Sequence, residues 1–386
     1  MAEPTPGQAA GPTRALAGRL AAAAWLGPAA FRAVLAGCLA ATVLLTWPLW
    51  QAREFPPPLP AVATLPQLSL GWPLLAACLL LAVVPRAGAA ACWLGFAVAM
   101  LLDQTRIQPP VVSLLMLSLG TLSWRPGLLA ARTSLVSLWL FAGLHKLLSP
   151  DYYTHLVPWL LGSDWDTAGG RAVAAGLAVR EVALGVGCLI PRTRKLVVVG
   201  GAVLHLAALA LLSPLGLSWN SAVWPWNVAL ACAGAALILP WRGRGFGDCW
   251  TVAPRWARAW AVGLLVMPLG YPLGLVDAYL AACVYAYNTP RAFLCTVFDR
   301  VDLNEFCESL NVTLPPEPRL FTPFFDQIGR PATWLEVEDP RWLVSGSKTI
   351  PWRPPTPGAP APITNAATRT MPTPDRPVGA APAAAR

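Results

Sequence analysis

Lys146 is the residue whose position most directly suggests chemistry in this chain. It lies near the end of an apolar stretch that begins near Thr133, and His145 precedes it. A lysine at the centre of a membrane helix costs about 3 kcal/mol, and less near the end, where its stem reaches the interface. Lys146 is therefore either a membrane anchor or a buried base, because burial disfavours the ammonium form. His145 faces elsewhere, since adjacent helical residues point about 100° apart.

Two charged residues lie near the middle of the next apolar run, residues 172–190. They are Arg180 and Glu181. Charges at that depth pair with each other or with a neighbouring helix. Glu181 is expected either to fix helix packing through an ion pair or to carry a proton in the same cavity as Lys146. We treat Lys146, Glu181 and His145 as the candidate catalytic residues.

Five more polar residues lie in or beside the apolar runs, and we expect them to line a cofactor site in the same cavity. They are Asp103, Arg106, His205, Asn220 and Asn227. Polar groups at membrane depth need partners, and one shared cavity satisfies several of them together. The alternative is a set of interfacial and helix–helix hydrogen bonds, which is the commoner role for a residue such as His205. With three histidines and no metal-ligand spacing among nine cysteines, no metal site is expected.

The composition predicts an all-α membrane protein. The chain is 56% hydrophobic and 12% charged, whereas soluble domains are about 25% charged. The chain has a net charge of +9 but no long basic block interleaved with aromatic residues, so a nucleic-acid partner is not expected. The expected partner is the lipid bilayer. About nine transmembrane helices are predicted, at residues 30–50, 70–84, 89–102, 111–122, 133–147, 172–190, 196–212, 219–239 and 259–287.

Basic residues set the expected orientation. If nine spans alternate from a cytoplasmic N-terminus, nearly all loop arginines and lysines fall inside, as the positive-inside rule requires. We therefore predict an integral protein of the bacterial inner membrane with an extracytoplasmic C-terminus. The expected parts are a disordered N-terminus (1–27), a transmembrane domain (28–290), a small extracytoplasmic segment (291–352) and a disordered Pro/Ala-rich tail (353–386). Pro268 and Pro272 predict a break in the ninth span.

The extracytoplasmic segment carries two further sequence features. Cys295 and Cys307 would face an oxidising compartment there and could form a disulfide. The triplet Asn311-Val312-Thr313 matches a glycosylation sequon, a pattern that also occurs often by chance.

The segment around Lys146 resembles a known family. Ala-Gly-Leu-His-Lys-Leu at 142–147, followed by Ser-Pro-Asp-Tyr at 149–152, resembles a segment of the vitamin K-dependent gamma-carboxylases. The same segment occurs in bacterial proteins with the horizontally transferred transmembrane (HTTM) domain, and a fainter likeness runs to DoxX-type proteins. The resemblance covers about residues 28–290. It implies that Lys146 is the base that acts on a reduced quinone such as vitamin K hydroquinone, with Glu181 in the following helix and a membrane or secreted protein as a further partner.

Two departures from the family and two possible functions remain open. Pro109-Pro110 stands where the carboxylases carry an asparagine–histidine pair, and residues 291–352 replace their large lumenal domain. The first function is a carboxylase-like or quinol-using enzyme with Lys146 as the base. The second is a non-catalytic membrane scaffold or DoxX-like electron-transfer component, in which Lys146 only anchors its helix. A quinone bound to the purified protein would distinguish the two.

Overall fold

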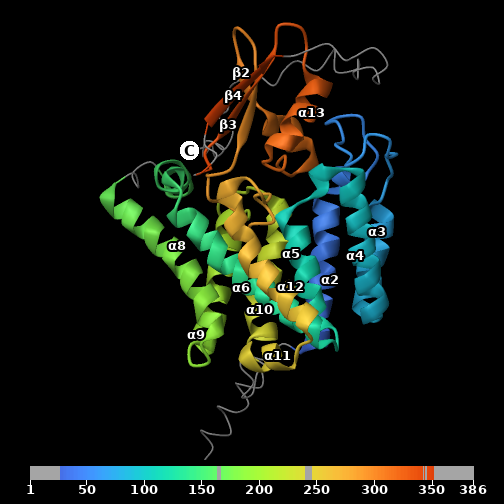
Figure 1. Cartoon of the computed structure of the whole chain (residues 1–386), viewed down its shortest axis with the longest axis vertical. Coiled ribbons are helices and arrows are strands. Elements are labelled where there is room, and N and C mark those ends of the chain that lie inside the picture. The colour runs from blue at the N-terminus through green and yellow to red at the C-terminus, as the bar shows by residue number, and fades with distance from the viewer. Residues whose placement is uncertain (1–26, 163–166, 240–245, 342, 344–345, 352–386) are drawn as a thin grey trace, which may run out of the picture.

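A bundle of apolar helices makes up most of the molecule, and a small sheet lies at one end of it (Figure 1). The computed structural model describes residues 27–162, 167–239, 246–341, 343 and 346–351. The principal helices of the bundle are α2 (Pro28–Leu45), α3 (Gly71–Val83), α4 (Pro85–Leu102), α5 (Pro109–Ser118), α6 (Arg125–Leu147), α8 (Ala168–Leu189), α9 (Arg194–Leu212), α10 (Trp224–Leu237) and α12 (Arg255–Val266). Short helices connect them: α7 (Val157–Leu161), α11 (Phe246–Val252) and several 3-10 or π segments.

Five helices are long and apolar enough to cross a membrane: α2, α4, α6, α8 and α9. This is what an integral membrane protein requires. Each of the nine predicted runs begins in or contains one of the principal helices within the described residues. Three of the others are shorter apolar helices, and α12 has only 12 residues, so the number nine stays a prediction.

Helix α6 lies at the centre of the bundle. In its apolar window 72% of the residues are buried, against 22% to 39% in the other four long helices. It crosses α8 closely at Gly143, where an added Cβ would lie 2.6 Å from the carbonyl oxygen of Ala178. Small residues at such crossings let two backbones approach, which favours association of helices in lipid. This contact brings the end of α6 that carries Lys146 against the middle of α8.

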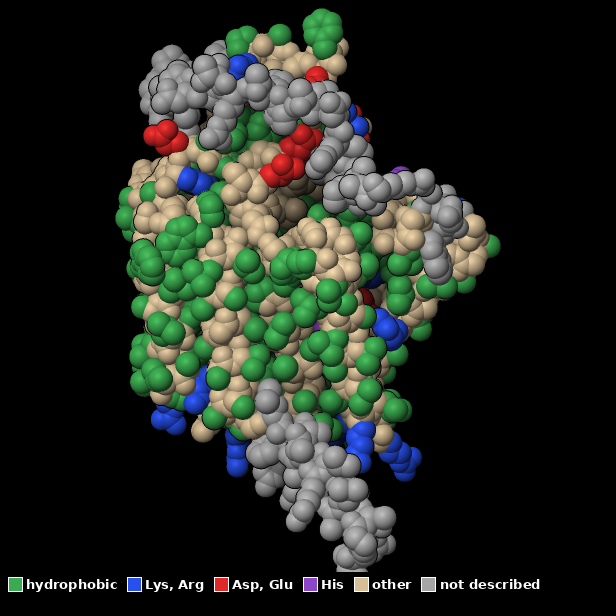
Figure 2. Space-filling model, turned by 180° about the vertical axis from the view of Figure 1, so that it is seen from behind, with side chains coloured by type: hydrophobic (Ala, Val, Ile, Leu, Met, Phe, Trp, Pro, Cys, Tyr) green, Lys and Arg blue, Asp and Glu red, His purple; other side chains and the backbone are tan. Residues whose placement is uncertain are grey.

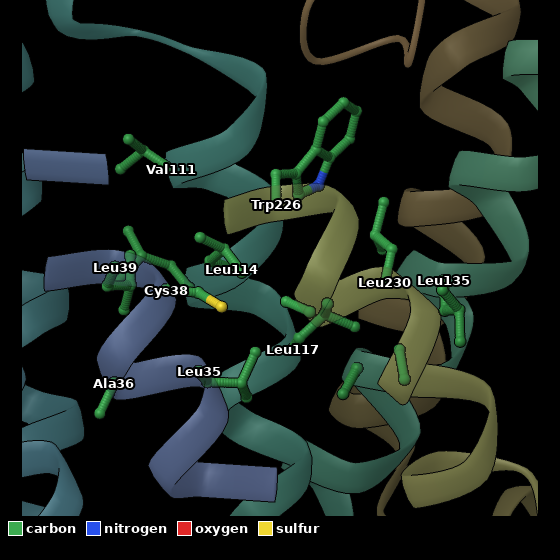
Figure 3. Close-up of a cluster of buried hydrophobic side chains, with 14 of the residues drawn as sticks. Leu35, Ala36, Cys38, Leu39, Val111, Leu114, Leu117, Leu135, Trp226 and Leu230 are labelled. Atoms are coloured by element: carbon green, nitrogen blue, oxygen red, sulfur yellow. The ribbon is translucent and has the colours of Figure 1, made fainter. Parts of the chain in front are cut away.

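Leucines from three helices form the core beside α6 (Figure 3). Leu35 and Leu39 come from α2, Leu114 from α5, and Leu230 from α10, and each is at most 1% exposed. Close packing of such side chains gives many weak dispersion contacts, which hold helices together even where lipid replaces water.

The ninth predicted span breaks as expected at its prolines. Helix α12 ends at Val266 and the 3-10 segment η7 (Met267–Leu273) comes next, but the chain then continues without a second half-helix. We call residues 274–290 the strap. Ala278 and Ala281 in the strap are fully buried. Irregular backbone at membrane depth is tolerated only where protein satisfies its polar groups, and side chains outside the strap bond Ala278 N and Ala281 O.

The chain after the strap forms a small subdomain. Its elements are β1 (Arg291–Cys295), β2 (Arg300–Asp302), η8 (Leu303–Leu310), α13 (Pro318–Ile328), β3 (Trp334–Asp339) and β4 (Gly346–Pro351). The strands pair antiparallel in the order β2-β1-β3-β4, and Phe324 and Phe325 of α13 pack beneath them with no exposure. A small segment was predicted here from the sequence, but its sheet was not.

The structure bears on two features of this subdomain that the sequence left open. Cys295 and Cys307 are both free and buried, because strand pairing directs Cys295 toward Glu336, whose Oε2 lies 3.6 Å from its Sγ. The asparagine of the sequon is hydrogen-bonded to the helical bundle: Asn311 Nδ2 donates to the carbonyl oxygen of Leu45 (2.9 Å) and to Ser221 Oγ (2.8 Å). Asn311 therefore joins the subdomain to the helices.

Charge is distributed unevenly along the molecule. Hydrophobic side chains cover the helical body, whereas lysines and arginines gather mainly at the end away from the sheet (Figure 2). Most of the acidic side chains visible on this face lie toward the sheet end. The same separation underlies the orientation predicted from the sequence.

Candidate functional site

Lys146 forms an ion pair inside the bundle. Its Nζ lies 2.6 Å from Glu181 Oε2, and the two side chains are 10% and 14% exposed. Both residues were predicted from the sequence to share one site, and the structure brings them together. A lysine that anchored its helix would extend to the membrane surface. Lys146 instead extends across the interface of α6 and α8.

The closeness of the two helices explains why the pair can form. Gly143 of α6 contacts Ala178 of α8 at the crossing. Lys146 lies one turn after Gly143, and Glu181 lies one turn after Ala178, so the two side chains come together. On the same face, Tyr152 packs against Ala174 and Ala178, with Tyr285 and Tyr287 of the strap around it. The pair thus lies in a water-poor region beside an aromatic cluster, where electrostatic interactions are strong.

His145 points away from the pair, as the helical geometry predicted. Its Nε2 lies 3.0 Å from the carbonyl oxygen of Ala281, so this nitrogen carries the proton and donates it. The ring also makes an edge contact with Tyr271, with 5.1 Å between centroids. His145 therefore fixes the strap onto α6. These contacts suit a residue that positions the strap beside Lys146, which is the neighbouring residue of α6.

Asp103 and Arg106 belong to a separate buried cluster. Asp103 Oδ2 lies 2.6 Å from Arg53 Nη2, while its Oδ1 accepts hydrogen bonds from Leu59 N and Thr105. Arg106 Nε donates to the carbonyl oxygen of Leu49 at 2.8 Å. These bonds fasten the connections between α2, α3, α4 and α5. The groups of this cluster therefore satisfy one another locally.

His205 and Asn227 form a third network. Trp139 Nε1 donates to His205 Nε2 at 2.9 Å, so His205 carries its proton on Nδ1 and donates it to Asn227 Oδ1 at 3.0 Å. Asn227 Nδ2 in turn donates to the carbonyl oxygen of Val223. The chain of bonds links α6, α9 and α10 and leaves neither ring nitrogen of His205 free. This is the helix–helix role that the sequence left open as the alternative.

Asn220 has a different environment from the other predicted residues. Its Nδ2 donates to the hydroxyl of Tyr285 at 3.0 Å, and it lines a cavity of about 780 Å³ between the helices and the subdomain. Lys146, Glu181, Asp103, Arg106, His205 and Asn227, which the sequence predicts to share a cavity with Asn220, do not line this one. Among these seven residues, Asn220 alone lines this cavity.

The cavity itself was not predicted. The outer ends of α2, α5 and α10 form its floor, the strap and Trp159 form one side, and β1, β2 and η8 form its roof. Leu156, Tyr285 and Tyr287 belong both to its lining and to the cluster around Tyr152. These three side chains therefore lie between the cavity and the region of the Lys146–Glu181 pair. The tyrosines of residues 279–287 could have indicated an aromatic cavity wall, but this stretch was predicted to be part of the ninth transmembrane helix.

Carboxylates line the roof of the cavity. They are Asp299, Asp302, Glu305 and Glu308. Burial raises the pKa of the Asp302 carboxyl, and burial together with the neighbouring Asp302 raises the pKa of Glu305. Among the residues that the structure describes, no group of three or more His, Cys, Asp or Glu side chains could hold a metal ion.

Comparisons with protein-family models, with curated proteins and with solved structures found no match to this chain. Its function is therefore inferred from the geometry described above.

Proposed function

We propose that this protein is a membrane enzyme that removes a proton from a quinol-sized substrate, with the Lys146–Glu181 pair as its base. The observation that carries the proposal is the 2.6 Å contact between Lys146 Nζ and Glu181 Oε2 inside the bundle. A buried ion pair contributes little net stability compared with apolar residues of the same size, so its presence calls for another role. The resemblance of residues 142–152 to the gamma-carboxylases supports the same assignment.

The pair can act as a base through an internal proton shift. A proton on Nζ moves to Oε2 over the short contact, which leaves a neutral amine beside a neutral carboxylic acid. The amine then takes a proton from a substrate hydroxyl, and the products are a quinolate, an ammonium and a protonated Glu181. An apolar environment favours the neutral intermediate over the separated charges. His145 has no proton to spare, because it donates to the strap.

The substrate class is set by what the site can accommodate. Tyr152, Tyr285 and Tyr287 form an aromatic cluster beside the pair. The cavity of about 780 Å³ on the other side of Tyr285 and Tyr287 has the size of a small-molecule site. A reduced quinone such as vitamin K hydroquinone carries both an aromatic ring and an acidic hydroxyl. Carboxylation of a protein glutamate is a narrower assignment, which this proposal does not include.

Lys146→Arg is the variant that tests this proposal. Arginine pairs with Glu181 as well as lysine does, but its guanidinium does not lose its proton at any physiological pH. Purified protein would be given vitamin K hydroquinone in the presence of air, and oxidation followed by absorbance. We expect a folded Arg variant without enzyme-dependent oxidation. Oxidation at the parental rate would mean that the pair is structural and that Lys146 is not the base. A parent protein that neither binds nor oxidises the quinol would favour the scaffold.

For the orientation, we propose nine spans with a cytoplasmic N-terminus and an extracytoplasmic subdomain in the bacterial inner membrane. The loop between α8 and α9 and the sheet lie at opposite ends of the bundle (Figure 1), and basic residues gather at the end away from the sheet (Figure 2). Reporter fusions after Lys195 and after Pro351 are expected on opposite sides. Both reporters on one side would contradict the orientation.

A further inference from the structure

The Lys146–Glu181 pair is separated from the cavity by a wall of side chains. Neither residue of the pair lines the cavity, and Leu156, Tyr285 and Tyr287 lie between the two. A quinol in the cavity therefore cannot touch Lys146 Nζ unless part of this wall moves. Two of the three side chains, Tyr285 and Tyr287, belong to the strap, which contains no helix or strand.

The backbone of residues 282–287 in the strap is strained and weakly held. Ala282, Tyr285 and Tyr287 have φ angles of 58°, 54° and 62°, in the left-handed region that residues other than glycine seldom adopt. In the part of the chain that the structure describes, the backbone N–H groups of residues 285–287 make no hydrogen bond. A strained segment with few backbone hydrogen bonds opens at a low cost in free energy.

Both ends of this segment are fixed to other parts of the molecule. Before it, His145 Nε2 donates a hydrogen bond to the carbonyl oxygen of Ala281 at 3.0 Å. After it, the hydroxyl of Tyr271 donates to the carbonyl oxygen of Asn288 at 2.9 Å. The middle can therefore move while the rest of the strap stays in place, which is the arrangement of a hinged flap.

One side-chain contact on each tyrosine keeps the segment in its closed position. Asn220 Nδ2 donates to the hydroxyl of Tyr285 at 3.0 Å. The guanidinium of Arg291 lies 4.8 Å from the centre of the Tyr287 ring, and its Nη2 lies 3.1 Å from Asp151 Oδ2. These contacts are made in the closed position, so loss of one shifts the segment toward an open position without changing its fixed ends.

We propose that residues 282–287 form a gate between the cavity and the Lys146–Glu181 pair, with the hydrogen bond between Asn220 and Tyr285 as its latch. When the gate opens, the two tyrosine rings leave the wall and the quinol hydroxyl reaches Lys146 Nζ. When it closes, the pair is shielded from water. This inference rests on the function proposed above, because it supplies the route of the substrate to its base. Asn220 is then a positioning residue, which acts on the reaction through Tyr285.

Chemical labelling of lysine measures the opening of the gate without any quinol. The chain has three lysines, and Lys348 on β4 is exposed and serves as the internal reference. Full-length protein in maltoside detergent would be treated with an excess of N-acetoxysuccinimide, and acetylation of Lys146 and Lys348 would be followed over time by peptide mass spectrometry. We expect Lys146 of the parent to react much more slowly than Lys348, because the reagent reaches its amine only through the open gate.

The variant Tyr285→Phe distinguishes a gate from a static wall. It keeps the ring and removes only the hydroxyl that Asn220 holds, so labelling of Lys146 should become about fivefold faster, the effect of one hydrogen bond. Tyr279→Phe is the matched control. Tyr279 also lines the cavity from the strap and its hydroxyl bonds to Thr313 Oγ1 at 2.5 Å, but it lies outside the cluster beside the pair. This control should leave both labelling rates unchanged.

The other partner of the latch gives a second variant. Asn220→Gly removes the donor, and glycine accepts the left-handed backbone of this residue, whose φ angle is 49°. It should accelerate labelling of Lys146 as much as Tyr285→Phe does. The double variant should be no faster than either single variant, because all three lack the same bond.

Unchanged labelling of Lys146 in Tyr285→Phe, an equal change in Tyr279→Phe, or labelling of Lys146 in the parent as fast as that of Lys348 would overturn the gate. The assay contains no quinol, so its failure is distinct from failure of the proposed function. Faster labelling in the latch variants, with no quinol oxidation by the parent, would refute the enzyme and leave the gate. Quinol oxidation with unchanged labelling would refute the gate and leave the enzyme.

Discussion

Lys146→Met should destabilise the protein by leaving Glu181 buried without a partner. The Glu181 side chain is 14% exposed, and its described ion-pair partner is Lys146. Removal of one member of a buried pair costs about 3–5 kcal/mol, which lowers Tm by roughly 5 °C for a chain of this size. A buried lysine without a partner would give the reverse result, because Met would remove a costly polar group from the bundle. The contact with Glu181 changes the sign.

The matched control is the double variant Lys146→Met/Glu181→Leu. It removes both charges, and replacement of a buried pair by apolar residues is often neutral or stabilising. We expect each single variant to melt early and the double variant to melt near the parent, in thermal unfolding of protein in maltoside. The strong non-additivity would measure the coupling of the two residues. Single variants with parental Tm, or a double variant as unstable as the sum of the singles, would refute the buried pair.

Three other contacts can each be tested by a single measurement. Burial raises the pKa of Glu317 to about 7, and the nearby Asp277 adds to this; a raised acid pKa stabilises the fold at low pH, so stability should be highest below about pH 4.5 and fall as pH rises through 7, a slope that Glu317→Gln removes. Asn227→Leu should cost about 1–3 kcal/mol, because a buried ring N–H of histidine loses its acceptor, yet leave quinol oxidation intact; loss of oxidation at full stability would make Asn227 a cofactor ligand. Alkylation of denatured, non-reduced protein should label both Cys295 and Cys307, and a bridged peptide would contradict the free thiols.

Much of the helical architecture could be predicted from the sequence because apolar runs in a membrane protein have few alternatives to helices. The break after Val266 was also predictable, because proline lacks the N–H that a helix interior requires. The path of the strap was not predictable, since the strap owes its shape to distant partners. Glu317 holds Ala278 N and His145 holds Ala281 O, and neither contact has a signal in the local sequence.

The site was predictable residue by residue but not as an arrangement. Lys146 and Glu181 stood out because intramembrane charges are expensive, and they do meet. Asp103 and His205 stood out for the same reason, but each is satisfied by its own neighbours. Because a buried polar group is costly without a partner, the sequence indicates that a partner exists, but it does not indicate which residue that partner is. Glu305 lines the cavity but was not predicted as a site residue, because a carboxylate on a polar segment is common and nothing in the local sequence indicates a cavity.

The proton state of Glu181 tests the central claim most directly. If the pair takes a proton from the substrate, addition of vitamin K hydroquinone should protonate Glu181 while Lys146 returns to its ammonium form. An infrared difference spectrum of the parent would then show the C=O stretch of a protonated carboxylic acid, and the same spectrum of Glu181→Gln would lack it. Appearance of the band in the parent and its loss in the variant is the result we predict. A parent spectrum without it, from protein shown to bind the quinol, would contradict the assignment of Lys146 and Glu181 as the base.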